Sequence, residues 1–246
     1  MNIILFEKDE LADSTILLSD HRAKHIVKVL QSLEGDTLRV GMLDGKTGEA
    51  TVVSVKRKYP FVVELYVNLN DQPIPPPAID LLLALPRPIM LKRILSQVTA
   101  LGVEAIYLLN ANRVEKSFWE AGILEEKEYR PHLIHGLEQA VDTRLPHIQI
   151  HRRFRPFAED VLPELASQYT KLLLAHPSAT ENLSGCLAGS NGRILYAVGP
   201  EGGWVDFEVA KLLSAGMQPF SMGNRILKVD TAVVAIHSRI CQEMEN

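Results

Sequence analysis

A glycine-rich stretch with one carboxylate, 199-GPEGGW-204, is the strongest chemical feature of the sequence. It follows an apolar run that ends at Val198 and precedes a helical pattern. We therefore expect it at the carboxyl end of a strand, where parallel α/β sheets bind their ligands. It matches neither GxGxxG nor GxxxxGK[ST], so the fingerprints of dinucleotide and ATP binding are absent. A simple strand-to-helix turn needs fewer glycines, and we predict a ligand loop.

A second stretch, 221-SMGNRILKVDTA-232, also leaves a strand and enters a helix. Gly223 and Asn224 can adopt left-handed backbone conformations. Arg225 and Lys228 form a basic pair that suits an RNA phosphate or a negative charge developing during a reaction. A residue of the VDTA end can equally serve as the cap of the next helix. Taken alone, the stretch fits a ligand site and a capped turn equally well.

Apolar strands alternate with amphipathic helices from residue 79 onward, which predicts a parallel α/β sheet covered on both faces. The expected strands are 79–85, 103–109, 148–150, 171–175, 193–198 and 217–222, and the expected helices are 90–102, 131–141, 205–216 and 230–244.

Residues 1–69 are typical of strands, and we predict a small β-barrel there. The expected strands are 3–6, 37–41, 50–55 and 61–67, with a hairpin turn at 43–48 and one helix capped by Ser19 or Asp20, whose apolar face is Ile26, Val27 and Leu30. Four prolines between Pro73 and Pro77 favour an extended connector. We therefore predict two domains, 1–72 and 73–246.

Composition and charge indicate an ordinary globular protein, with 46% apolar and 23% charged residues. The net charge of −4 argues against a general nucleic-acid binder, so RNA contacts must depend on local basic clusters. Cys186 and Cys241 cannot form a disulfide framework, and the histidines lack metal-ligand spacing, so we assign no metal. The apolar runs are too short to cross a bilayer, and the N-terminus lacks a secretory pattern; we expect a cytoplasmic protein.

The two glycine motifs, with Glu208 on the helix between them, closely resemble the RsmE-type ribosomal RNA methyltransferases of the SPOUT superfamily. Weaker similarities are spread along the chain. They are HRAKHIVKVL near the N-terminus, 95-LSQVTALGVEAI-106, and Glu138-Gln139 followed by Arg144 and Pro146.

This resemblance implies a SAM-dependent enzyme that methylates N3 of a uridine in 16S ribosomal RNA of the small subunit. It implies a C-terminal trefoil knot, an N-terminal PUA-like, RNA-binding barrel and a homodimer. S-adenosyl-L-methionine (SAM) would be held by three loops, at 174–177, 199–203 and 222–227. The implied cofactor-binding residues are Leu174, Ala175, His176, Gly199, Pro200, Glu201, Gly202, Gly203, Met222, Gly223, Asn224, Ile226, Leu227 and Thr231.

Uracil N3 carries a proton at neutral pH, so the reaction needs a base or cations that stabilise the uracil anion. Arg225 is our first choice for contact with the uracil or a nearby phosphate, and Glu201 or Asp230 is the candidate base. We expect Arg113 to enter the site from a partner subunit. The candidate RNA-binding residues are Arg22, Lys24, Lys28, Arg113, Arg225 and Lys228. We interpret the basic run 152–155 as a solvated face.

The chain departs from the family pattern at several positions, namely Lys228, Asp230, Met222, Ala100, Gln31 and Asp142. Lysine cannot reproduce a bidentate arginine contact, so these departures bear on the choice of RNA target. The alternatives are a SPOUT methyltransferase for another rRNA or tRNA nucleotide, a non-catalytic knotted RNA-binding module, and a nucleotide-dependent α/β enzyme.

Overall fold

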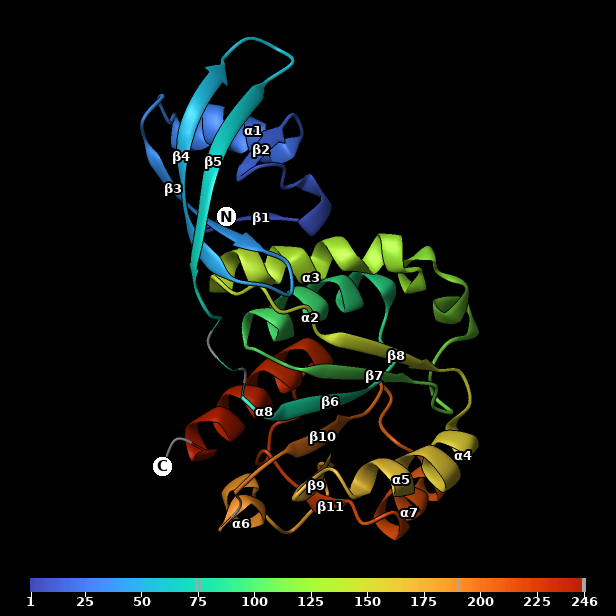
Figure 1. Ribbon diagram of the computed structural model, residues 1–246. Coiled ribbons are helices and arrows are strands. Elements are labelled where there is room, and N and C mark those ends of the chain that lie inside the picture. Colours follow the sequence, from blue (N-terminus) through green and yellow to red (C-terminus); the bar gives the residue numbers. More distant parts are fainter. Residues whose placement is uncertain (74, 76, 190, 245–246) are drawn as a thin grey trace. The chain divides into compact units, whose positions relative to one another are not determined.

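The computed structural model describes residues 1–73, 75, 77–189 and 191–244. The chain forms two compact units (Figure 1). The first unit contains Met1–Pro75 and Ile134–Leu145, and the second contains Pro76–Leu133 and Pro146–Asn246. Two residues of the predicted proline connector, Ile74 and Pro76, lie outside the described residues.

A five-stranded sheet forms most of the first unit, in the order β1-β3-β4-β5-β2. β1 is parallel to β3, and the other pairs are antiparallel. β2 was not predicted, because its four residues stand alone between two polar turns. No pairing among the described strands joins β1 to β2, so the closed barrel stays a prediction. The strands are β1 (Ile4–Phe6), β2 (Thr15–Leu18), β3 (Thr37–Met42), β4 (Thr47–Lys56) and β5 (Val62–Asp71).

The predicted helix of the first unit is present as α1 (His21–His25), continued by the π-helical turn η2 (Ile26–Leu30). Asp20 is the cap, because its side chain accepts a hydrogen bond from the backbone N–H of Arg22 at 2.9 Å. Ile26 and Val27 are buried in the sheet core, whereas Leu30 is 43% exposed and lies outside it. A short 3-10 turn, η1 (Lys8–Glu10), precedes β2.

A six-stranded sheet forms the centre of the second unit, in the order β11-β9-β10-β6-β7-β8. All its pairs are parallel, which confirms the predicted α/β class. Every residue of β6, β7 and β10 is buried, as expected for central strands covered on both faces. The strands are β6 (Ile79–Ala84), β7 (Ala105–Leu109), β8 (His147–His151), β9 (Lys171–Ala175), β10 (Ile194–Val198) and β11 (Gln218–Phe220).

The long helices of this half of the sequence lie close to the predicted positions. The helix predicted to begin at Pro131 is α3, which begins earlier, at Glu126, so Pro131 lies inside it. The C-terminal part of α3, from Ile134 onward, belongs to the first unit. We did not predict α6 or the helices between β8 and β9, because each has at most five residues, too few to show a helical repeat of apolar side chains. The bounds are α2 (Pro88–Ala100), η3 (Lys116–Glu120), η4 (Gly122–Leu124), α3 (Glu126–Ala140), α4 (Phe154–Pro156), η5 (Phe157–Val161), α5 (Leu162–Ala166), α6 (Leu183–Leu187), α7 (Asp206–Ser214) and α8 (Val229–Met244).

No helix in the described part of the chain has the length and apolar character needed to span a membrane. Among the same residues, no group of three or more His, Cys, Asp or Glu side chains is placed to hold a metal ion.

Candidate functional site

The second unit has a cavity of about 720 Å³ at the carboxyl ends of its parallel strands. This volume is within the range of small-molecule sites, and the position is the one that parallel α/β sheets use for ligands. The walls come from the segments after β6, β7, β9, β10 and β11, and from the start of α8. The lining residues are Arg87, Met90, Arg113, Ala175, His176, Pro177, Ser178, Val198, Gly199, Pro200, Glu201, Gly202, Gly203, Trp204, Phe220, Met222, Gly223, Arg225, Ile226, Leu227, Lys228, Val229, Ala232 and Ile236.

The order of the sheet explains why these segments meet. β10 lies between β9 and β6, although β6 comes more than a hundred residues earlier in the chain. From β6 the chain continues to β7 on one side, whereas from β10 it continues to β11 on the other side. The point between β6 and β10 is therefore a topological switch point. The loops after β6 and β10 open there into one cavity.

The glycines of the 199–204 loop allow two side chains of this chain to pack closely. A Cβ atom on Gly199 would lie 2.9 Å from Nε1 of Trp204, and one on Gly202 would lie 3.0 Å from Cδ of Arg113. Gly203 has φ of +75°, a conformation that side-chain-bearing residues rarely adopt. The glycine density thus shapes the loop around Trp204 and Arg113, in addition to bringing the backbone to the cavity.

Arg113 lines the cavity of its own chain, and its entry into the site of a partner subunit stays a prediction. Its guanidinium donates a hydrogen bond to the carbonyl of Gly202. Its loop is fixed by the buried Glu208, whose carboxylate accepts the N–H of Asn112 at 2.6 Å and that of Val205 at 3.0 Å. Glu208 therefore joins the Arg113 loop to the first turn of α7.

The second motif contributes Met222, Gly223, Arg225, Ile226, Leu227 and Lys228 to the cavity. Ile226 is 86% exposed, so its side chain stands at the rim of the cavity. Asn224 and Thr231, which we had expected to bind the cofactor, do not line it. Leu174 is also absent from the walls, because its side chain is fully buried within β9. The predicted cofactor contacts of Asn224 and Thr231, which are exposed, stay predictions.

The two candidate bases occupy different surroundings. Glu201 lines the cavity, and its Oε1 accepts the N–H of Arg87 at 3.4 Å. Asp230 is only 8% exposed and does not line the cavity; its Oδ2 accepts a hydrogen bond from Arg93 of α2 at 3.1 Å. Asp230 also accepts the N–H of Thr231, so it orders the start of α8. The geometry thus favours Glu201 and argues against Asp230 as a base.

Sequence reasoning missed Arg87 and Met90, which bring the loop after β6 and the first turn of α2 into the site. Their position after an apolar strand was a usable signal, because every strand end of a parallel sheet opens on the same edge. Trp204 was quoted only as part of its motif. It is 6% exposed, and its Nε1 has no hydrogen-bond partner among the described atoms.

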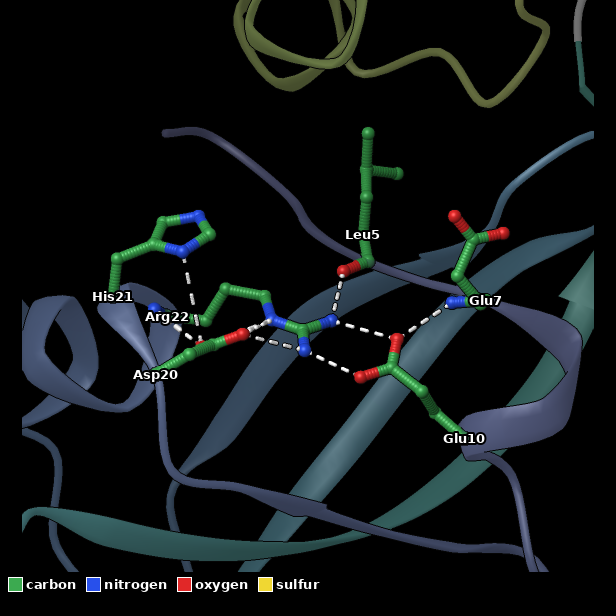
Figure 2. A network of polar contacts seen from close by, with 6 residues as sticks. All are labelled: Leu5, Glu7, Glu10, Asp20, His21 and Arg22. Carbon is green, nitrogen blue, oxygen red and sulfur yellow. Dashed lines mark hydrogen bonds and ion pairs between the residues drawn. The ribbon is translucent and has the colours of Figure 1, made fainter. Parts of the chain in front are cut away.

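The three predicted RNA contacts of the first unit differ in whether their charged groups are free to bind a phosphate. Figure 2 shows Arg22 held between Glu10, Asp20 and the carbonyl of Leu5. All five N–H donors of its guanidinium are used in these contacts, so none is left for a phosphate. The hydrogen bond from Arg22 also holds the pKa of Glu10 below its usual value. Arg22 is thus a structural residue, contrary to our prediction, whereas Lys24 and Lys28 are exposed.

Comparison with known proteins agrees with this architecture. Residues 73–241 match the model of a family described as an RNA methyltransferase domain. The ribosomal RNA small subunit methyltransferase E of Treponema pallidum is 33% identical over 239 residues, which cover 96% of this chain and 88% of the relative. Methyltransferase E 1 of Borreliella burgdorferi is 26% identical over 235 residues, covering 96% and 95%.

Two solved structures share the fold. The methyltransferase E of Neisseria gonorrhoeae, crystallised with S-adenosyl methionine, has a TM-score of 0.75 at 22% identity and covers 98% of this chain and 97% of that chain. A probable rRNA methyltransferase of Porphyromonas gingivalis has a TM-score of 0.76 at 20% identity, covering 100% and 99%. Fold, cavity and family model together define an RNA methyltransferase. More narrowly, the chain belongs to the ribosomal RNA small subunit methyltransferase E family.

Proposed function

We propose that this enzyme transfers a methyl group from SAM to N3 of one uridine in small-subunit ribosomal RNA. One observation carries the proposal. The two glycine motifs that resemble the family pattern come together around a single cavity, which contains four cations and one carboxylate. The curated relatives are named for methylation of small-subunit ribosomal RNA, and this supports the choice of substrate.

The residues of the cavity fit SAM. Apolar side chains that suit an adenine ring, including Phe220, Ile226 and Leu227, stand beside backbone-rich loops that supply N–H and C=O groups. SAM has no phosphate, so the absence of a P-loop lysine from the glycine loop agrees with this choice. When bound, SAM would supply an electrophilic methyl group, whose bond to the sulfonium sulfur breaks as the bond to the nucleophilic nitrogen forms and a neutral thioether leaves. Gly199 to Gly203 and Met222 to Leu227 would hold it in this site.

Four cations of the chain are placed to manage the charge of the substrate. Arg87, Arg113, Arg225 and Lys228 all line the cavity. Loss of the N3 proton leaves a negative charge shared by O2 and O4 of uracil, and fixed cations in a cavity stabilise such a charge strongly. We assign this role first to Arg225, because its side chain makes no ion pair or hydrogen bond in the described part of the chain.

Glu201 is the residue that we propose to accept the N3 proton. It is the one carboxylate among the lining residues in the described part of the chain. As the proton passes to the Glu201 carboxylate, the N3 lone pair becomes available to form the new N–C bond. The backbone N–H of Arg87 contacts one carboxylate oxygen and leaves the other free to take the proton.

Finer features follow from the family resemblance, and we propose them for this chain. We propose a C-terminal trefoil knot, supported by the position of β10 between β9 and β6. We propose a PUA-like, RNA-binding barrel for the first unit, supported by its curled five-stranded sheet. We propose a homodimer, supported by the exposure of Ile89 (71%) and Ile226 (86%) in the second unit. We propose a cytoplasmic location, supported by ribosomal RNA as the proposed substrate.

The test of the function is to delete the gene and map ribosomal and transfer RNA modifications by mass spectrometry. We expect one N3-methyluridine to disappear from small-subunit RNA and to return when the purified enzyme and labelled SAM are added to that RNA. The loss of a different mark, in rRNA or tRNA, would replace the substrate but keep the enzyme class. SAM binding without any lost mark would indicate a non-catalytic binding module.

A further inference from the structure

Two segments of the first unit form a basic and aromatic surface that the methyltransferase site does not use. They are residues 24–33, from α1 to the turn after η2, and residues 56–61, at the tip of the β4–β5 hairpin; we call them the hairpin patch. The hairpin tip extends beyond the rest of its sheet (Figure 1). Lys28 Nζ lies 5.2 Å from the ring centroid of Phe61, and the Arg57 guanidinium donates to the carbonyl of Ser32 at 2.6 Å. These contacts hold the two segments together.

Large apolar side chains are unusually exposed on the hairpin patch. Tyr59 is 86% exposed, Val29 is 65% exposed and Leu33 is 60% exposed. The Tyr59 ring meets the Phe61 ring edge to face at a centroid distance of 6.2 Å, which fixes the direction in which Tyr59 projects. An aromatic ring presented in this way offers a flat face to a stacking partner.

The charge of the hairpin patch is the opposite of the charge of the chain. Its two segments contain five cations and no carboxylate, although the whole chain has a net charge of −4. The cations are Lys24, Lys28, Lys56, Arg57 and Lys58. The nearest acidic residues along the chain are Glu34, Asp36 and Glu64. The Asp36 carboxylate accepts the N–H of Leu33 at 2.7 Å, and the Glu64 carboxylate accepts the Ser54 hydroxyl at 3.1 Å. The surface therefore complements a polyanion.

We propose that the hairpin patch binds a single-stranded segment of the RNA substrate, at a surface separate from the methyl-transfer cavity. One unpaired base stacks on Tyr59, and the flanking phosphates contact Lys28, Lys56 and Lys58. An exposed aromatic ring beside lysines favours single-stranded RNA over a duplex, because the bases of a duplex are already stacked. The charge of the patch favours RNA over a protein partner. This inference rests on the proposed function only for the identity of the RNA.

The direct test measures binding of the full-length protein to a fluorescent, uridine-rich single-stranded RNA. We expect Tyr59→Ala to weaken binding about tenfold, the typical loss for one stacked base. The double variant Lys56→Ala/Lys58→Ala removes two phosphate contacts, so the slope of log K against log salt should fall by about 1.4. Tyr66→Ala is the matched control, because Tyr66 is 53% exposed on β5 outside the patch. Lys8→Ala/Lys46→Ala is the control for charge.

Steady-state methylation of small-subunit RNA gives the second readout. We expect the patch variants to raise KM about tenfold and to leave kcat and SAM binding unchanged, because no residue of the hairpin patch lines the cavity. Unchanged RNA affinity in the patch variants would overturn the proposal, and so would an equal loss in Tyr66→Ala or an equal effect on duplex RNA. Self-association that disappears in Tyr59→Ala would assign the patch to a protein interface instead. A wild-type protein that binds the RNA through Tyr59 but transfers no methyl group would refute the proposed function alone.

Discussion

The charged side chains at the two ends of the six-stranded sheet differ in whether they form ion pairs. At the amino ends of the strands, the fully buried Asp80 accepts hydrogen bonds from Arg193, Tyr169 and the N–H of Ala105. Arg193 also pairs with Glu104 at 2.8 Å. Asp80, Arg193 and Glu104 thus all have a charged partner within the chain.

At the carboxyl ends, Arg87, Arg225 and Lys228 line the cavity without an ion pair in the described part of the chain. Asp80 and Arg193 at the amino ends of the strands are thus paired, whereas three cations beside the proposed substrate site have no such partner among the described residues. Unpaired charge next to a cavity is therefore a better guide to the site than charge alone.

The largest expected effect is at the compensated end. Asp80→Ala leaves Arg193, the Tyr169 hydroxyl and the Ala105 N–H without their acceptor, and removal of one member of such a buried group costs about 3 to 5 kcal/mol. Urea unfolding measures this loss. Glu104→Ala, at a residue whose side chain is 42% exposed, is the control and should cost less than about 1 kcal/mol. Equal losses in both variants would contradict the contrast between the ends.

Glu208 is a buried carboxylate at the carboxyl end of the sheet that has backbone partners, and we assign it a structural role. Glu208→Ala leaves the N–H groups of Asn112 and Val205 without their acceptor, and we expect a loss of about 3 kcal/mol in unfolding free energy. Glu208→Gln retains one acceptor oxygen and should lose about half as much. Because the Asn112 contact positions Arg113, methyl transfer should fall further in Glu208→Ala than its folded fraction explains. Activity that follows the folded fraction would remove the positioning role.

Arg225→Ala tests the uncompensated end directly. We expect methyl transfer to fall about a hundredfold, the usual cost of removing one group that stabilises a developing anion. The midpoint of unfolding and SAM affinity, measured by calorimetry, should stay at the wild-type values. Arg93→Ala serves as a control, because Arg93 pairs with Asp230 rather than lining the cavity. Wild-type turnover in Arg225→Ala would show that another cation has this role.

His237 lies between the two ends, buried against β10, and gives the smallest effect. Its Nε2 contacts the carbonyl of Leu101 at 3.2 Å and its Nδ1 contacts the Tyr196 hydroxyl at 3.3 Å. Burial lowers its pKa to about 4. The unfolded chain therefore binds more protons between pH 4 and the ordinary pKa, and stability is lost as the pH falls through this window. From about pH 7.5 to pH 5 we expect a loss of about 2 kcal/mol.

The non-titrating variant His237→Gln separates this loss from the titration of carboxylates. The difference in unfolding free energy between wild type and His237→Gln should shrink by about the same 2 kcal/mol over that pH range. A difference that does not change with pH would mean that His237 titrates alike in the folded and unfolded chains.

Local patterns predicted much of this molecule. Alternating apolar strands and amphipathic helices indicated the parallel sheet, and the two glycine motifs identified the loops that form the cavity. Each of these signals is contained in a short stretch of sequence, and the strand-end rule turns it into a location.

The errors arose where a side chain's role depends on distant partners. Arg22 has the composition of an RNA contact, but the fold surrounds it with Glu10 and Asp20. Arg87 was missed because its approach to Glu201 depends on β10 lying beside β6, a pairing between distant strands. The position of Arg113 likewise depends on a distant residue, because Glu208, 95 positions later, holds its loop.

The place of β10 in the sheet also has a consequence for how the chain is made. Ile79 of β6 pairs with Ile194 of β10, so this partner is synthesised 115 residues later (194 minus 79). At about 5 to 20 residues per second, one edge of an entirely buried strand waits roughly 6 to 23 seconds for its neighbour. During this interval β6 presents apolar side chains and unpaired backbone groups, which are features that promote aggregation. The strand order that creates the cavity thus leaves one edge of β6 without its partner for part of translation.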